Sequence, residues 1–181
     1  MKRKIQWITQ TAIVLALLVT LQTLTKGLGQ LVTGSCVNAV LAVSVLIGGL
    51  GSGVTVALIS PVLAFLLGIA PQILTVPAIM VGNTVYVLLL HSVAGRDSCK
   101  LLRQILAWIS AACAKFAALY GIVVWLICGV LSEELLAAGA LKAPMLKALP
   151  ATFSWPQLVT ALIGGAVGLL ITPVLRKALQ N

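Results

Sequence analysis

The residues that could do chemistry in this sequence are few, and they stand inside long apolar stretches. Lys115, Asn83 and Asn38 are the candidates for a buried polar site. A lysine at the middle of a bilayer costs about 2.5–3.5 kcal/mol on insertion scales. Lys115 is therefore expected to contact water or a ligand, to extend towards the inner membrane surface, or to pair with backbone. The two amides are expected to hydrogen-bond between helices, and Asn83 is also a candidate ligand contact.

Catalytic groups are missing from these stretches. The chain has three acids in all, and they fall between the apolar stretches: Asp97, Glu133 and Glu134. Hydrolases and transferases need general acids, general bases or a metal, and a proton-coupled carrier needs an intramembrane carboxylate. No HExxH, GxSxG or Walker A motif occurs, and one His with four scattered Cys makes no zinc set. We therefore expect no enzyme, no cofactor and no metal site.

The composition identifies lipid as the solvent of this chain. Of its 181 residues 61% are hydrophobic and 8% are charged, with a mean hydropathy of +1.16. A soluble domain carries roughly a quarter charged residues, so a soluble, disordered or disulfide-stapled chain is excluded. The net charge of +9 does not indicate nucleic-acid binding, because the basic residues stand at the ends of the apolar stretches. We expect an all-α integral membrane protein.

Gly, Pro and charged residues divide residues 1–181 into six transmembrane helices of one compact bundle. The predicted spans are roughly 5–24, 36–50, 54–67, 78–93, 105–131 and 155–175, since about 20 apolar residues cross a bilayer. The segments 26–34, 68–77 and 132–153 are expected to be loops, and the glycines of 50–54 a tight turn. The first span is expected to be retained, because no A-x-A-like cleavage site follows it.

Basic residues are distributed unequally between the two sides of this arrangement. One side holds eight of them: Lys2, Arg3, Lys4, Arg96, Lys100, Arg103, Arg176 and Lys177. The other side holds three: Lys26, Lys142 and Lys147. Because short cytoplasmic loops are enriched in Lys and Arg, both termini are expected in the cytoplasm.

Small residues form stripes on the first and last spans. The first-span stripe is Thr9, Ala12, Ala16, Thr20 and Thr23, and the sixth-span stripe is Thr160, Gly164, Gly168 and Thr172. Small residues let helix backbones approach closely in membranes. We expect the sixth-span stripe to pack inside the bundle, whereas the first-span stripe either packs inside or meets a partner.

Polar groups also gather at the predicted outer ends of the spans. Trp155 and Gln157 open the sixth span, where a helix N-terminus offers free N–H groups and positive potential. Lys26 and Gln30 lie in the first outer segment. With no acid in any span, these donors and Lys115 favour an anionic or polar neutral ligand over a cation.

Together these features resemble the substrate-binding S component of energy-coupling factor (ECF) transporters, a bacterial vitamin-uptake family. Ala12-x-x-x-Ala16 looks like the A-x-x-x-A docking motif of that family. PAIMVGNTVYVLL (77–89) and SWPQLVTALIGGAVGLLI (154–171) are similar to its fourth and sixth spans. The resemblance covers nearly the whole chain.

The resemblance implies a multi-pass protein of the bacterial cytoplasmic membrane that binds a small water-soluble nutrient from outside. It would dock through Ala12 and Ala16 onto a transmembrane coupling subunit that carries two ATP-binding subunits. The pocket would lie in the outer half, with these candidate contacts: Lys26, Gln30, Asn83, Lys115, Trp155 and Gln157. The alternatives are a small membrane scaffold without a ligand and a self-sufficient facilitator.

The charge distribution makes a testable prediction about orientation. In a variant without native cysteines, Ser98→Cys is expected to resist a membrane-impermeant thiol reagent in intact cells, and Glu134→Cys to react with it. The reason is that Lys and Arg retain the segment around residue 98 in the cytoplasm. External labelling at position 98 would reverse the orientation.

Overall fold

The computed structural model describes residues 2–70, 72–94 and 101–180, and no strand occurs among them. The main helices are α1 (Lys2–Thr25), α2 (Gln30–Leu66), α3 (Val76–Ala94), α4 (Leu101–Leu119) and α7 (Trp155–Gln180). Shorter elements are η1 (Lys26–Leu28), η2 (Ile73–Thr75), the π-helix η3 (Tyr120–Val130), α5 (Ser132–Ala137) and α6 (Met145–Phe153). Five helical stretches of the described chain are long and apolar enough to cross a membrane.

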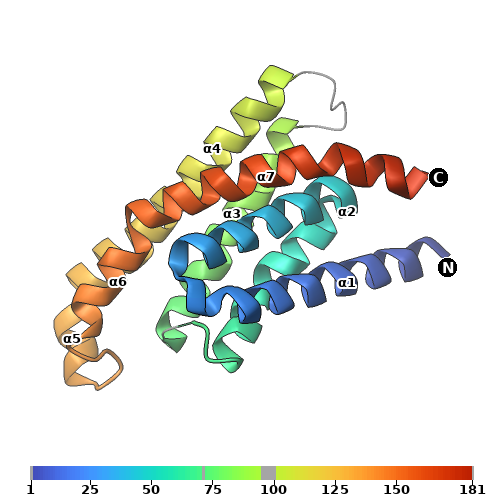
Figure 1. Cartoon of the computed structure of the whole chain (residues 1–181). Helices are drawn as coiled ribbons and strands as arrows, with labels where there is room; N and C mark the ends of the chain where they lie inside the picture. Colours follow the sequence, from blue (N-terminus) through green and yellow to red (C-terminus); the bar gives the residue numbers. More distant parts are fainter. Residues whose placement is uncertain (1, 71, 95–100, 181) are drawn as a thin grey trace.

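The long helix α2 consists of two antiparallel halves joined at Gly49. Gly49 has φ 80° and ψ 179°, which a helix does not contain, and glycine adopts positive φ without steric cost. A Cβ atom on Gly53 would lie 2.8 Å from the Cβ atom of Val45, although residues eight apart in a continuous helix are about 12 Å apart. The chain visibly reverses here (Figure 1). The two halves of α2 therefore run in opposite directions, and the described chain runs along the bundle six times.

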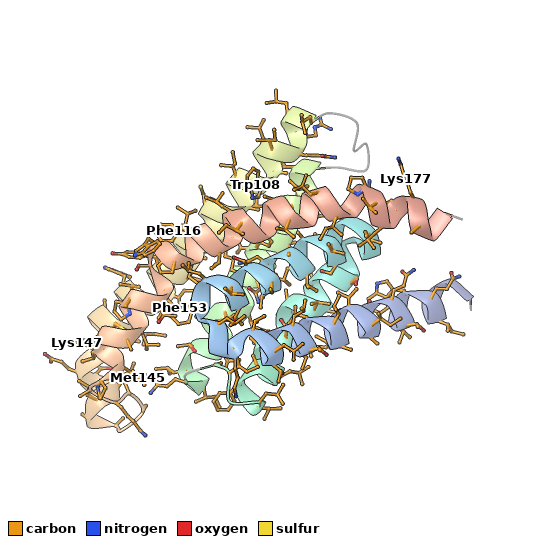
Figure 2. The ribbon with its side chains drawn as sticks, viewed as in Figure 1. Trp108, Phe116, Met145, Lys147, Phe153 and Lys177 are labelled. Atoms are coloured by element: carbon orange, nitrogen blue, oxygen red, sulfur yellow. The ribbon has the colours of Figure 1, made fainter. Side chains whose placement is uncertain are left out.

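Both termini lie at one end of the bundle, and α5 lies at the other (Figure 1). We call the end with η1, η2, α5 and α6 the distal end. Figure 2 shows Lys147 of α6 near this end and Lys177 of α7 near the termini. The shared end agrees with an even number of passes.

Several predicted boundaries were wrong. The segment 26–34 is not a loop, because α2 already begins at Gln30 and only Gly29, at φ 90°, breaks the helix. The turn expected at 50–54 lies at Gly49 alone. The segment 68–77 contains η2 and the start of α3. Pro77 does not prevent α3 from beginning here, because proline is tolerated in the first turn of a helix.

The predicted loop 132–153 was also wrong, because it folds into α5 and α6. Leu149 and Phe153 of α6 are buried against Leu119 and Val123, at the junction of α4 and η3. Apolar side chains at these spacings give α6 a face to bury, and this packing stabilises a helix too short to be stable alone. The polar segment 94–103 lies largely outside the described residues.

The small residues of α7 pack inside the bundle, as predicted. A Cβ atom on Gly164 would overlap the backbone oxygen of Ser35, and one on Gly168 would lie 2.6 Å from the Cβ atom of Ala42. These contacts bring the backbones of α7 and α2 together. By contrast, the α1 stripe of Thr9, Ala12, Ala16, Thr20 and Thr23 is exposed.

This packing predicts that Gly164→Ala destabilises the bundle, since the added methyl group meets backbone that cannot rotate away. Overpacking of this kind costs about 1–3 kcal/mol, and it should lower the midpoint of thermal unfolding in detergent. Gly121→Ala is the control, because no atom lies within 4 Å of its added Cβ. Equal midpoints for both variants would contradict the close approach of α7 to α2.

Candidate ligand-binding site

The most distinctive polar feature of the bundle is a buried lysine held by two amides. Lys115 Nζ donates hydrogen bonds to Asn38 Oδ1 at 2.6 Å and to Asn83 Oδ1 at 2.7 Å. Lys115 is 3% exposed, and each asparagine is 1% exposed. The three residues belong to α4, α2 and α3. We call them the Lys115 cluster.

The lysine determines how both amides are oriented. A lysine nitrogen in the ammonium form only donates, so each asparagine must turn its oxygen towards Nζ and its nitrogen elsewhere. Asn38 Nδ2 donates to Gly34 O at 2.9 Å and lies 3.4 Å from Thr160 Oγ1, which connects the cluster to α7. Asn83 Nδ2 is buried and has no hydrogen-bond partner in the described chain.

An aromatic ring also faces the lysine. Lys115 Nζ lies 5.5 Å from the centroid of the Tyr86 ring. The ring face carries negative potential, and it attracts a cation at this distance. Two amide oxygens and one ring therefore surround Nζ with negative potential.

A cavity of about 110 Å³ lies against the Lys115 cluster. Its polar lining includes Gln22, Gln30, Thr33, Ser60, Thr152 and Gln157, and its apolar lining includes Val37, Pro61, Ile79, Leu119 and Phe153. These residues come from α1, α2, α3, α4, α6 and α7, so the whole bundle shapes the cavity. Exposed Gln30, at the start of α2, is on its rim at the distal end.

Several buried polar atoms in the cavity lining lack a partner. Within the described chain these are Gln22 Oε1, Ser60 Oγ and Asn83 Nδ2. Leaving such a group unsatisfied costs about 1–3 kcal/mol, so each one is a position at which a bound molecule would be stabilised. The cavity thus presents a donor from Asn83, an acceptor from Gln22, and a hydroxyl from Ser60.

The cavity closes on an apolar layer towards the termini. Five helical segments each place one polar residue at the cavity: Gln22, Asn38, Ser60, Asn83 and Lys115. One helical turn closer to the termini, each of these segments has a fully buried residue. These residues are Leu18, Ala42, Val56, Val87 and Ala111, each 0% exposed. The polar site therefore has an apolar floor.

The charge of the cavity comes from Lys115, since no acid is present among its lining residues. Of the acids in the described chain, Glu133 and Glu134 lie on α5, away from the lining. No group of His, Cys, Asp and Glu in the described ranges could hold a metal ion. The arrangement can hold an acceptor-rich or anionic molecule by hydrogen bonds.

The structure brings four of the six predicted contact residues together: Gln30, Asn83, Lys115 and Gln157. Lys26 and Trp155 do not line the cavity. Lys26 is exposed on η1, and Trp155 is 62% exposed. Phe153 and Gln157, on either side of Trp155 in the sequence, are the residues that line the cavity here.

Lys115 Nζ contacts two side-chain amides within the bundle, and it extends neither to a backbone group nor towards the end of the bundle that holds the termini. It meets Asn38, eight residues from the distal start of α2, and Asn83, seven residues from the distal start of α3. The expected hydrogen bonding of Asn38 between helices is confirmed by its contacts with Thr160 and Lys115. The lining residues Gln22, Thr33 and Ser60 are not among the predicted contacts. Each of these three is a polar residue within an apolar stretch, and this sequence feature could have identified it.

No family model, curated protein or solved structure matches this chain.

The Lys115 cluster predicts energetic coupling between its members. Lys115→Met leaves the Asn83 oxygen buried without a donor, and adding Asn83→Leu removes that unpaired oxygen. The double variant should therefore be less destabilised than the sum of the single variants by about 0.5–3 kcal/mol, measured by unfolding in mixed detergent micelles. Thr84→Ala, whose hydroxyl bonds Met80 O, should combine additively with Lys115→Met. Additivity at Asn83 would contradict the pairing.

Proposed function

We propose that this chain is the substrate-binding S component of an ECF-type transporter in a bacterial cytoplasmic membrane. It takes up a small water-soluble nutrient, with the vitamin class as the expected kind. The observation that carries the proposal is the polar cavity: a bundle that is 61% hydrophobic in sequence surrounds a buried ammonium group and three unpartnered polar atoms.

The buried polar groups argue against a ligand-free scaffold. Each unsatisfied group lowers stability by about 1–3 kcal/mol, and apolar residues of similar size would fill the same space without that cost. A binding function accounts for the arrangement, because the ligand supplies the missing partners. The lining residues come from six helices, so a bound ligand would also stabilise the bundle as a whole.

The exposed face of α1 supports docking to a partner. Ala12 and Ala16 are exposed, and the buried residues Thr11, Leu18 and Gln22 lie on another face of the same helix. Ala12 and Ala16 create a shallow surface that a partner helix can approach closely. The chain carries no Walker A sequence, so ATP-driven uptake requires separate ATP-binding subunits.

An apolar groove of about 290 Å³ lies between α1, α2 and α7, on a different face of α1 from Ala12 and Ala16. Leu17 of α1, Val40 of α2 and Ile171 of α7 are among its lining residues. It gives the bundle a second apolar surface that a partner helix could contact. Such a surface suits contact with a transmembrane coupling subunit.

Ala12→Trp and Ala16→Trp test the proposal. Each substitution should abolish co-purification with the coupling subunit and the ATP-binding subunits, because an indole prevents close helix approach. Uptake of the molecule that mass spectrometry finds on the purified protein should be lost, while binding of that molecule should be retained. The α1 residue that lines the cavity is Gln22, which lies on another face of the helix from both alanines.

Leu170→Trp is the matched control, since Leu170 is 75% exposed on α7. It should leave co-purification and uptake unchanged. Uptake by cells lacking every coupling subunit would favour the facilitator instead. Normal co-purification and uptake with both α1 substitutions would exclude docking through this face.

A further inference from the structure

The Lys115 ammonium group has hydrogen-bond partners but no countercharge. Asn38 and Asn83 are neutral, and no Asp or Glu is found among the residues lining the cavity. A buried charge without a partner of opposite sign is costly, and this cost is the reason that intramembrane lysines mark functional sites. A bound anion would supply the missing charge next to Nζ.

Two hydrogen-bond donors adjoin each other at this point. An ammonium group carries three N–H bonds, and the two asparagines accept two of them, so one remains. Asn83 Nδ2 belongs to the same amide as the oxygen that Lys115 contacts, and it is buried without a partner. Since Asn83 and Lys115 both line the cavity, two adjacent donors are available for two adjacent acceptor atoms.

The number of charges and donors distinguishes between kinds of anion. A phosphate monoester carries nearly two charges and three strong acceptor oxygens, and its sites typically use Arg forks or several backbone N–H groups. The lining contains a single charged residue and no Arg. A carboxylate has one charge and two oxygens, and this matches one ammonium group and one amide.

The remaining walls restrict the body of the ligand. Val37, Ile79, Leu119 and Phe153 provide apolar surface, and the volume is about 110 Å³. A cavity of about 150 Å³ holds benzene, so the enclosed part of the ligand is about the size of a six-membered ring or smaller. A longer molecule would extend past the exposed Gln30 at the rim.

We infer that the cavity binds a small monocarboxylate, whose carboxylate accepts hydrogen bonds from Lys115 Nζ and Asn83 Nδ2. The apolar body lies against Leu119 and Phe153. Gln22 Oε1 provides a buried acceptor for a hydroxyl or N–H group elsewhere on the ligand. This inference deepens the proposed function by naming the class of substrate, and it depends on the cavity rather than on docking.

Matched sets of small molecules test the ligand class on the detergent-purified full chain. One set is butanoate, butanamide and butylamine, and the other is benzoate, benzamide and benzylamine. Saturation-transfer NMR detects binding, and the rise of the unfolding midpoint with concentration gives the affinity. At least one acid should bind about tenfold or more tightly than its amide, and its amine should not bind.

Two variants connect this preference to the Lys115 cluster. Asn83→Asp keeps the shape and the acceptor for Lys115, but it supplies a countercharge and removes the Nδ2 donor. It should reduce affinity for the acid at least tenfold while the protein remains folded. Lys115→Met should have the same effect, and Thr84→Ala, one residue away on α3, should leave the preference for acids unchanged.

Other outcomes would overturn the inference. Equal binding of acid and amide would identify a neutral ligand, and preferential binding of an amine would identify a cation site. An undiminished acid preference in Asn83→Asp would place the anion elsewhere. Absence of acid binding at about 10 mM, where a site of millimolar affinity is largely occupied, would also refute it. Docking through Ala12 and Ala16 would stand in each case, just as loss of docking would leave carboxylate binding intact.

Discussion

The burial of one lysine is the constraint on which the rest of this arrangement depends. Lys115 stands in a bundle that is apolar on nearly every side, and its nitrogen is stabilised because two amide oxygens meet it at 2.6 and 2.7 Å. Those oxygens come from α2 and α3, so the lysine on α4 fixes the rotation of three helices about their axes. A shift of one residue in any of them would remove a partner and leave the ammonium group in an apolar environment.

The close packing of α7 on α2 makes this polar contact geometrically feasible. Gly164 allows α7 to approach so near that a Cβ atom there would overlap the backbone at Ser35. One turn earlier, Thr160 then lies within 3.4 Å of Asn38 Nδ2 and donates its own hydroxyl hydrogen to Gln157 O. The small residues of α7 therefore support the polar site as well as the packing. They let α7 approach Asn38 on the side of its amide that does not face Lys115.

Hydropathy and spacing predicted the all-helical bundle, the chain reversal near residue 50 and the internal position of the α7 stripe, because these are local properties of sequence. Polar residues inside apolar stretches identified Lys115 and Asn83 for the same reason. The partnership of Asn38 with Lys115 could not be predicted, since it depends on the relative rotation of α2 and α4. Two other features could not be predicted from local sequence. The position of Trp155 at a helix start does not determine the direction of its side chain. The helix α6 is stabilised by burial of Leu149 and Phe153 in tertiary contacts.

The position of the cavity within the bundle bears on whether this chain could conduct its ligand unaided. Polar side chains from five passes meet on the distal side, and one turn further each pass contributes a residue that is 0% exposed: Leu18, Ala42, Val56, Val87 and Ala111. Close-packed side chains of this kind leave no route for a hydrated anion. A ligand that enters from the distal end therefore reaches a closed floor, and its release towards the termini requires a rearrangement larger than a side-chain rotation. This geometry supports the proposed binding subunit, which would depend on a partner for release, over a passive pore.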